Sequence, residues 1–170
     1  MNEQAQIHTI EGFFAAGLMV LTVTLITRSS VIITPQSEIA MDVQLKQLAD
    51  DTLGMLDKAP GTAIQFNLTE LVAGWNMTEA TPQSNSLHAL DTEMDRQLNG
   101  VMYNIDFAYA ENGTLTVKHA IIHGAPVGNS VVTTRLVTLY NSTVMQAGGA
   151  WNVSSSDLKV VEVRLVAWRV

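Results

Sequence analysis

The chain contains no cysteine among its 170 residues, so neither a disulfide framework nor a thiolate metal site can form. Lysine and arginine together number only nine, against sixteen aspartates and glutamates, and the formal net charge is −7. Nucleic-acid binding depends on clustered cations that neutralise phosphates. We therefore expect no nucleic-acid partner.

The motifs of common catalytic sites are also lacking. The sequence has neither a glycine-rich phosphate loop nor a Gly-X-Ser-X-Gly element. His119 and His123 fall in a predicted strand, which would hold them ~13 Å apart. The acidic run at 91–95 has Arg96 where a calcium loop requires glycine, so we interpret it as a solvated helix face. We expect no enzyme activity, no catalytic residue, no metal and no cofactor.

A long apolar segment is present at residues 7–33, interrupted only by one acid, Glu11, and one cation, Arg28. Its length suits a transmembrane helix. A carboxylate at the edge of hydrocarbon is costly and therefore indicates a function for Glu11. Residues 1–10 contain no lysine or arginine, and residues 27–31 lack the small-residue pattern of a cleavage site. An uncleaved anchor is therefore favoured over a signal peptide, with the lipid bilayer as a partner.

Asn-X-Ser/Thr sequons occur five times, all after the apolar segment. Such sequons are glycosylation acceptors on the surface of exported domains. Although the position of Arg28 favours the opposite orientation by the positive-inside rule, we predict a single-pass glycoprotein of the cell membrane with its C-terminal domain extracellular. The sequons begin at Asn67, Asn76, Asn112, Asn141 and Asn152.

The rest of the chain predicts an α+β domain. After a kink at Pro35, apolar residues recur at helical spacing over 38–58, which indicates an amphipathic helix that ends at 59–61. We expect this helix to pack on an antiparallel sheet, with the anchor at 1–36 and the extracytoplasmic domain at 37–170. Further helices are predicted at 68–75 and 87–98, and strands at 101–110, 114–123, 131–140 and 158–170.

Two local features refine this picture. Asn112-Gly113 between the first two strands is a strong hairpin signal, because both residues tolerate positive φ. Trp151 lies in a Gly/Ser-rich loop beside a sequon, so we expect it to be exposed and a candidate for surface contact. Trp168 in the last strand is expected to pack against the helix at 38–58.

The opening Gln4–Gly12, which reads Gln-Ala-Gln-Ile-His-Thr-Ile-Glu-Gly, resembles an uncharacterised archaeal family of membrane-anchored, type IV pilin-like proteins. The similarity extends to residues 111–115, 124–126, 137–140 and 160–169. Pilins place a glutamate at the fifth position of an apolar helix, as Glu11 stands relative to Ile7. Gln6 stands where processed pilins carry glycine or alanine before the cut, which leaves the processing of the N-terminus open.

The resemblance implies a pilin-like fold and a structural role. The chain would be a minor pilin or pseudopilin-like component of an archaeal type IV pilus-like surface filament or secretion assembly. Its partners would be similar subunits or copies of itself. Glu11 would pair with the free amine of a neighbouring subunit, and Ile7, Phe13 and Phe14 would pack in the assembly. The alternative is a permanently membrane-anchored cell-surface binding or adhesion module that forms no filament.

Overall fold

The computed structural model describes residues 3–29, 35–58 and 67–169 and divides into two compact units, Met1–Glu38 and Ile39–Val170. The first unit contains helix α1, Glu3–Ser29. The second contains most of helix α2, Pro35–Lys58, and an α+β domain.

The predicted transmembrane helix is wrong. No helix within the described residues combines the length and the hydropathy that crossing a bilayer requires. The uncharged stretch between Glu11 and Arg28 in α1 has only sixteen residues. At 1.5 Å rise per residue it covers roughly 24 Å, less than the ~30 Å hydrocarbon core. The predicted localisation, a single pass through the cell membrane with the C-terminal domain outside, depended on that helix and is wrong as well.

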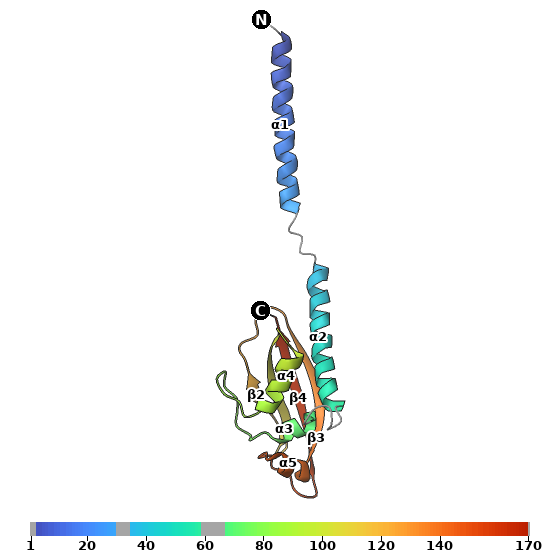
Figure 1. Ribbon diagram of the computed structural model, residues 1–170, viewed down its shortest axis with the longest axis vertical. Helices are drawn as coiled ribbons and strands as arrows, with labels where there is room; N and C mark the ends of the chain where they lie inside the picture. Colours follow the sequence, from blue (N-terminus) through green and yellow to red (C-terminus); the bar gives the residue numbers. More distant parts are fainter. Residues whose placement is uncertain (1–2, 30–34, 59–66, 170) are drawn as a thin grey trace. The chain divides into compact units, whose positions relative to one another are not determined.

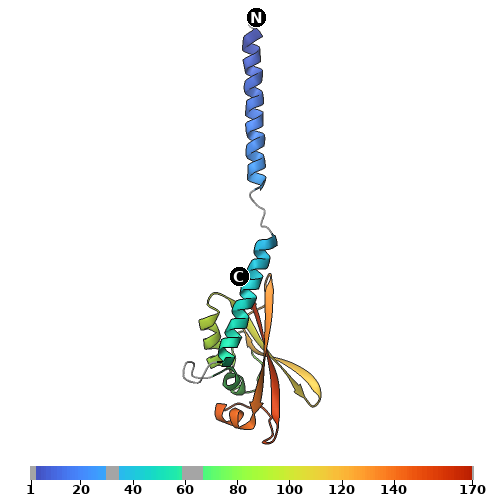
Figure 2. The same ribbon diagram turned by 90° about the vertical axis from the view of Figure 1, so that its right-hand side faces the viewer.

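The second unit is built on one four-stranded antiparallel sheet in the order β2-β1-β4-β3. Its strands are β1 Met102–Glu111, β2 Thr114–Ile122, β3 Ser130–Tyr140 and β4 Leu158–Trp168. Figure 1 shows α2 and α4 in front of this sheet, and Figure 2 shows the helices gathered on the same face. The other face carries no helix in these views.

The β1–β2 hairpin confirms the turn predicted at Asn112-Gly113. Asn112 has φ 51° and Gly113 has φ 77°, which are the two consecutive positive values of a type I′ turn. The bulge between Ile105 and Asp106 shifts the pairing of the two strands. The sheet therefore forms from local turn chemistry as well as from burial of one face.

Helix α2 supplies one side of the core through a buried stripe at Leu45, Ala49, Leu53 and Leu56. This spacing of three and four residues is the one predicted for an amphipathic helix. The helix begins at Pro35 rather than at Glu38, because proline is favoured at a first helical position. Residues 30–34, before the predicted kink, and the stop predicted at 59–61 lie outside the described residues.

Shorter helices close the core at its ends. Helix α3, Leu68–Ala73, is fixed by a reciprocal capping box between Asn67 and Glu70. Helix α4, His88–Gln97, buries Leu90 and Met94. Helix α5, Asn141–Ala147, was not predicted, because it is short and follows a strand without a side-chain cap.

Candidate functional site

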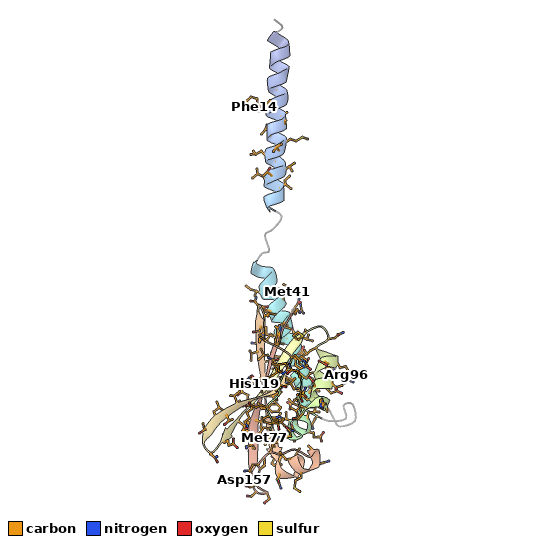
Figure 3. All side chains as sticks on the ribbon, turned by 90° about the vertical axis from the view of Figure 1, so that its left-hand side faces the viewer. Phe14, Met41, Met77, Arg96, His119 and Asp157 are labelled. Atoms are coloured by element: carbon orange, nitrogen blue, oxygen red, sulfur yellow. The ribbon has the colours of Figure 1, made fainter. Side chains whose placement is uncertain are left out.

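Helix α1 presents an apolar surface on all sides. Large hydrophobic residues at nine positions between Phe13 and Ile26 are each more than half exposed, with Phe13 at 79%. At 100° per residue these positions surround the helix without a continuous polar face. Figure 3 shows their side chains, Phe14 among them, projecting to both sides of the helix. The nine are Phe13, Phe14, Leu18, Met19, Val20, Leu21, Val23, Leu25 and Ile26.

Two threonine hydroxyls of α1 are bonded to the helix backbone. Thr22 Oγ1 donates to the carbonyl of Leu18, and Thr24 Oγ1 donates to that of Val20, both at 2.7 Å. The hydroxyl donors of Thr22 and Thr24 are therefore satisfied inside the helix, which lowers the cost of covering this part of the surface with apolar groups.

The residues expected to act in assembly all fall on α1. Ile7 lies in the helix, and Phe13 and Phe14 are exposed. Glu11 is exposed as well and is the only acidic residue between Glu3 and Glu38. The structure thus places the four predicted assembly residues on a single helix.

The five sequons differ in accessibility. Asn76, Asn112 and Asn152 are exposed, and Asn112 stands at the tip of the β1–β2 hairpin. Asn67 and Asn141 are half-buried. The side-chain oxygen of Asn67 is already used to cap α3.

The expectation that Trp151 is exposed is corrected, because only 5% of this residue is accessible. Its Nε1 donates to the carbonyl of Val72 at 2.8 Å, and its ring packs 5.2 Å from Trp75 and 5.0 Å from Tyr109. Trp168 is also buried, but it alternates with the core residues of β4 and so lies on the sheet face opposite α2. Neither indole offers a surface for a ligand.

A polar cluster lies at the edge of the second unit where α4, β1 and the end of β2 meet. Asp91 and Asp95 are one turn apart on α4, and His123 follows β2 directly. His123 Nε2 lies 2.8 Å from Asp91 Oδ1. The hydroxyl of Tyr103, from β1, lies 2.8 Å from Asp91 Oδ1 and 2.9 Å from Asp95 Oδ1. Asn85 donates to the second carboxylate oxygen of Asp91 at 2.9 Å.

The electrostatics of this cluster favour a charged Asp91 and a neutral Tyr103. Burial on its own would raise the pKa of Asp91, but hydrogen bonds with Tyr103, His123 and Asn85 outweigh it and hold the pKa below its usual value. Burial, followed by the two neighbouring carboxylates, raises the pKa of Tyr103 well above its usual range. The phenol therefore stays protonated and serves as a hydrogen-bond donor.

The sequence prediction missed this cluster. It treated the acidic run at 91–95 as a solvated face and placed His119 and His123 in one strand, ~13 Å apart. The spacing of Asp91 and Asp95 was the available signal, since residues four apart share one face of a helix. The bulge after Ile105 and the end of β2 at Ile122 separate the two histidines: His119 lies beside Asp106, at 2.6 Å, and His123 beside Asp91.

These features define a class of protein. In this class an apolar helix and an antiparallel α+β domain, with its helices on one sheet face, belong to the same chain. The chain belongs to a family described as "Family of unknown function (DUF7288)", which matches residues 4–167. It is 27% identical over 176 residues to a protein of Archaeoglobus fulgidus described as uncharacterised, covering 99% of this chain and 94% of the relative. No solved structure matches the chain. The expected archaeal, uncharacterised family is thus supported, and neither description mentions pilins.

Proposed function

We propose that this protein is a minor pilin- or pseudopilin-like structural subunit that assembles with similar subunits, or with copies of itself, through helix α1. The observation that carries the proposal is the apolar surface that surrounds α1. A helix that is hydrophobic on all sides is normally buried. Each large side chain that becomes buried contributes about 1.5–3 kcal/mol.

The occupant that best fits this surface is the α1 helix of another subunit. The apolar positions lie all round the helix, so one α1 can contact several neighbours at once, as in the core of a filament. The hydrogen bonds of Thr22 and Thr24 to the helix backbone support this arrangement, since these two hydroxyl donors need no partner across the contact. The resemblance of Gln4–Gly12 to pilin-like proteins points to the same assembly.

Glu11 sets the register of neighbouring helices in this proposal. It is the only acid in the stretch between Glu3 and Glu38. A cation of the next subunit, such as its N-terminal amine, can therefore pair with a carboxylate at only one position along this stretch. Breaking such a pair after it is buried costs ~3–5 kcal/mol. This step rests on the pilin resemblance.

The first test compares Phe14→Ser with Leu136→Ser in the full chain. The two side chains are equally exposed, at 66% and 67%, but Leu136 lies on β3 in the second unit. Loss of one buried phenylalanine should weaken self-association roughly 10- to 100-fold. Analytical ultracentrifugation and negative-stain microscopy should show large assemblies for the wild type and for Leu136→Ser, but not for Phe14→Ser.

A wild-type chain that stays monomeric at high concentration would refute assembly and favour a binding module that forms no filament. The second test follows Glu11→Ala and Glu11→Gln during co-purification of tagged chains with filaments sheared from native cells. We expect both variants to lose incorporation while total abundance is unchanged. Equal recovery of Glu11→Ala and wild type would remove the pairing role from Glu11.

A further inference from the structure

The polar cluster at Asp91, Asp95 and His123 gathers two carboxylates and one imidazole around the Tyr103 hydroxyl. The Tyr103 hydroxyl carries one proton, yet three oxygens lie within 3.0 Å of it: Oδ1 of Asp91, Oδ1 of Asp95 and the main-chain carbonyl of Asp91. One proton satisfies only one of these contacts. Tyr103 is 1% exposed, so water has little access to the buried side of its hydroxyl.

Two arginines of the second unit are paired within their own elements. Arg96, on the same helix, pairs with Glu93 at 2.5 Å, and Arg164 pairs with Glu162 at 3.0 Å. Figure 3 shows Arg96 projecting from α4 at the surface. His123 is the ion-pair partner of Asp91 in the described part of the chain, and it is charged only when protonated. The cluster therefore sets two carboxylates beside one imidazole.

From this geometry we propose that Asp91, Asp95 and His123 bind a first-row divalent transition-metal ion. One ligand atom from each residue lies within 4.8 Å of the other two. Ions of this class bind imidazole nitrogen and carboxylate oxygen at ~2.0–2.2 Å, so a small closure around the ion brings all three into reach. Remaining coordination positions would be filled by water, since the His123 and Asp91 side chains are 29% and 18% exposed.

The donor set discriminates between classes of ion. Calcium and magnesium prefer sites made wholly of oxygen ligands, whereas an imidazole among the ligands suits zinc and other first-row ions. Tyr103 is a positioning residue here, because its hydroxyl contacts both carboxylates and holds them close together. Asn85 orients Asp91 through the carboxylate oxygen that His123 leaves unused.

A bound ion would join two segments that are distant in the sequence. Asp91 and Asp95 come from α4, while His123 follows the strand at the sheet edge. A ligand that binds the native state alone raises the midpoint of thermal unfolding as its concentration rises. The site therefore has a readout that does not depend on any activity.

The experiment uses the tag-free full chain, treated with chelator and then titrated with Zn²⁺, Mn²⁺, Ca²⁺ and Mg²⁺. Calorimetry should show one Zn²⁺ or Mn²⁺ per chain, and the thermal midpoint should rise with that ion. Asp95→Asn and His123→Gln should each weaken binding at least 10-fold. Asp95 is exposed and His123 is partly exposed, and circular dichroism of the metal-free variants checks that both still fold.

The chain supplies a matched control in His119 and Asp106. Their side chains lie 2.6 Å apart, as close as His123 and Asp91, and they face away from the core on β2 and β1. His119→Gln should leave metal binding unchanged. The proposal is overturned if no ion binds with a stoichiometry of one, if His123→Gln and His119→Gln behave alike, or if Ca²⁺ or Mg²⁺ binds more tightly than Zn²⁺ and Mn²⁺.

Discussion

Replacing Trp151 tests whether this indole is part of the core, as the structure has it, or a surface contact. Trp151 is 5% exposed and packs on the rings of Trp75 and Tyr109. Trp151→Ala leaves a cavity among these rings, and truncation of a buried tryptophan or phenylalanine costs about 3–5 kcal/mol. A substitution at an exposed contact changes the free energy of unfolding by no more than about 0.5 kcal/mol.

Trp151→Phe separates packing from hydrogen bonding. It retains most of the ring but removes the Nε1 donor that contacts the Val72 carbonyl at 2.8 Å. That carbonyl also accepts from the amide of Trp75 at 3.2 Å, so it keeps one partner. We therefore expect Trp151→Phe to cost only about 1–2 kcal/mol, well below the alanine variant.

Urea unfolding of the full chain, followed by circular dichroism, measures both variants. Leu136→Ala is the control, because Leu136 is 67% exposed on the open face of the sheet. The expected order of stability is wild type and control together, then Trp151→Phe, then Trp151→Ala. A Trp151→Ala chain that unfolds within about 0.5 kcal/mol of the wild type would refute the buried position and restore the surface contact that the sequence predicted.

Three further outcomes follow from the structure. Gly149→Ala should destabilise the fold by at least about 1–3 kcal/mol in urea unfolding, because an added Cβ would overlap the main-chain carbonyl of Ala73, whereas Gly124→Ala should be nearly neutral. The pKa of Asp91 is lowered on folding, so its contribution to the stability of the native state is present above its unfolded pKa of 3.8 and is lost as pH falls through the native pKa. In the presence of chelator, the thermal midpoint of Asp91→Asn should therefore fall less than that of the wild type as the pH is lowered. Deletion of residues 1–34 should leave a folded monomer in size-exclusion chromatography, since the core lies within the second compact unit.

The features that follow from local sequence rules were predicted. The hairpin turn needs only positive φ at Asn112 and Gly113, and both residues supply it. The stripe on α2 follows from apolar spacing alone. Each is decided within a few residues, so a single sequence contains the required information.

Features that depend on distant partners were not predicted. Trp151 is held in the core by the Val72 carbonyl and by the rings of Trp75 and Tyr109, and these contacts join its loop to α3 and β1. A glycine-rich loop gives no sign of this, because its composition predicts exposure. The membrane-spanning length of α1 was overestimated for a different reason. The prediction included residues on the outer sides of Glu11 and Arg28, beyond the uncharged stretch.

The polar cluster shows why candidate metal ligands are missed when only residues close together in the sequence are compared. Asp91 and Asp95 precede His123 by about 30 residues, and β1 lies between them in the chain. Because β2 pairs antiparallel to β1, the end of β2 brings His123 next to α4. Tyr103 on β1 contacts both carboxylates of that helix. The long-range pairing of the sheet, rather than any spacing of ligands, creates the cluster.

The proposed assembly and the proposed metal binding use different units of the chain, so we expect each to persist without the other. The proposed assembly surface belongs to α1 in the first unit, whereas Asp91, Asp95 and His123 lie within the second. Each ligand is held by contacts inside the second unit, so a chain lacking residues 1–34 should bind Zn²⁺ or Mn²⁺ as the full chain does while losing self-association. Conversely, His123→Gln should leave assembly intact. If one substitution abolished both properties with the fold preserved, the two sites would have to be coupled, and the independence argued from their separate units would be wrong.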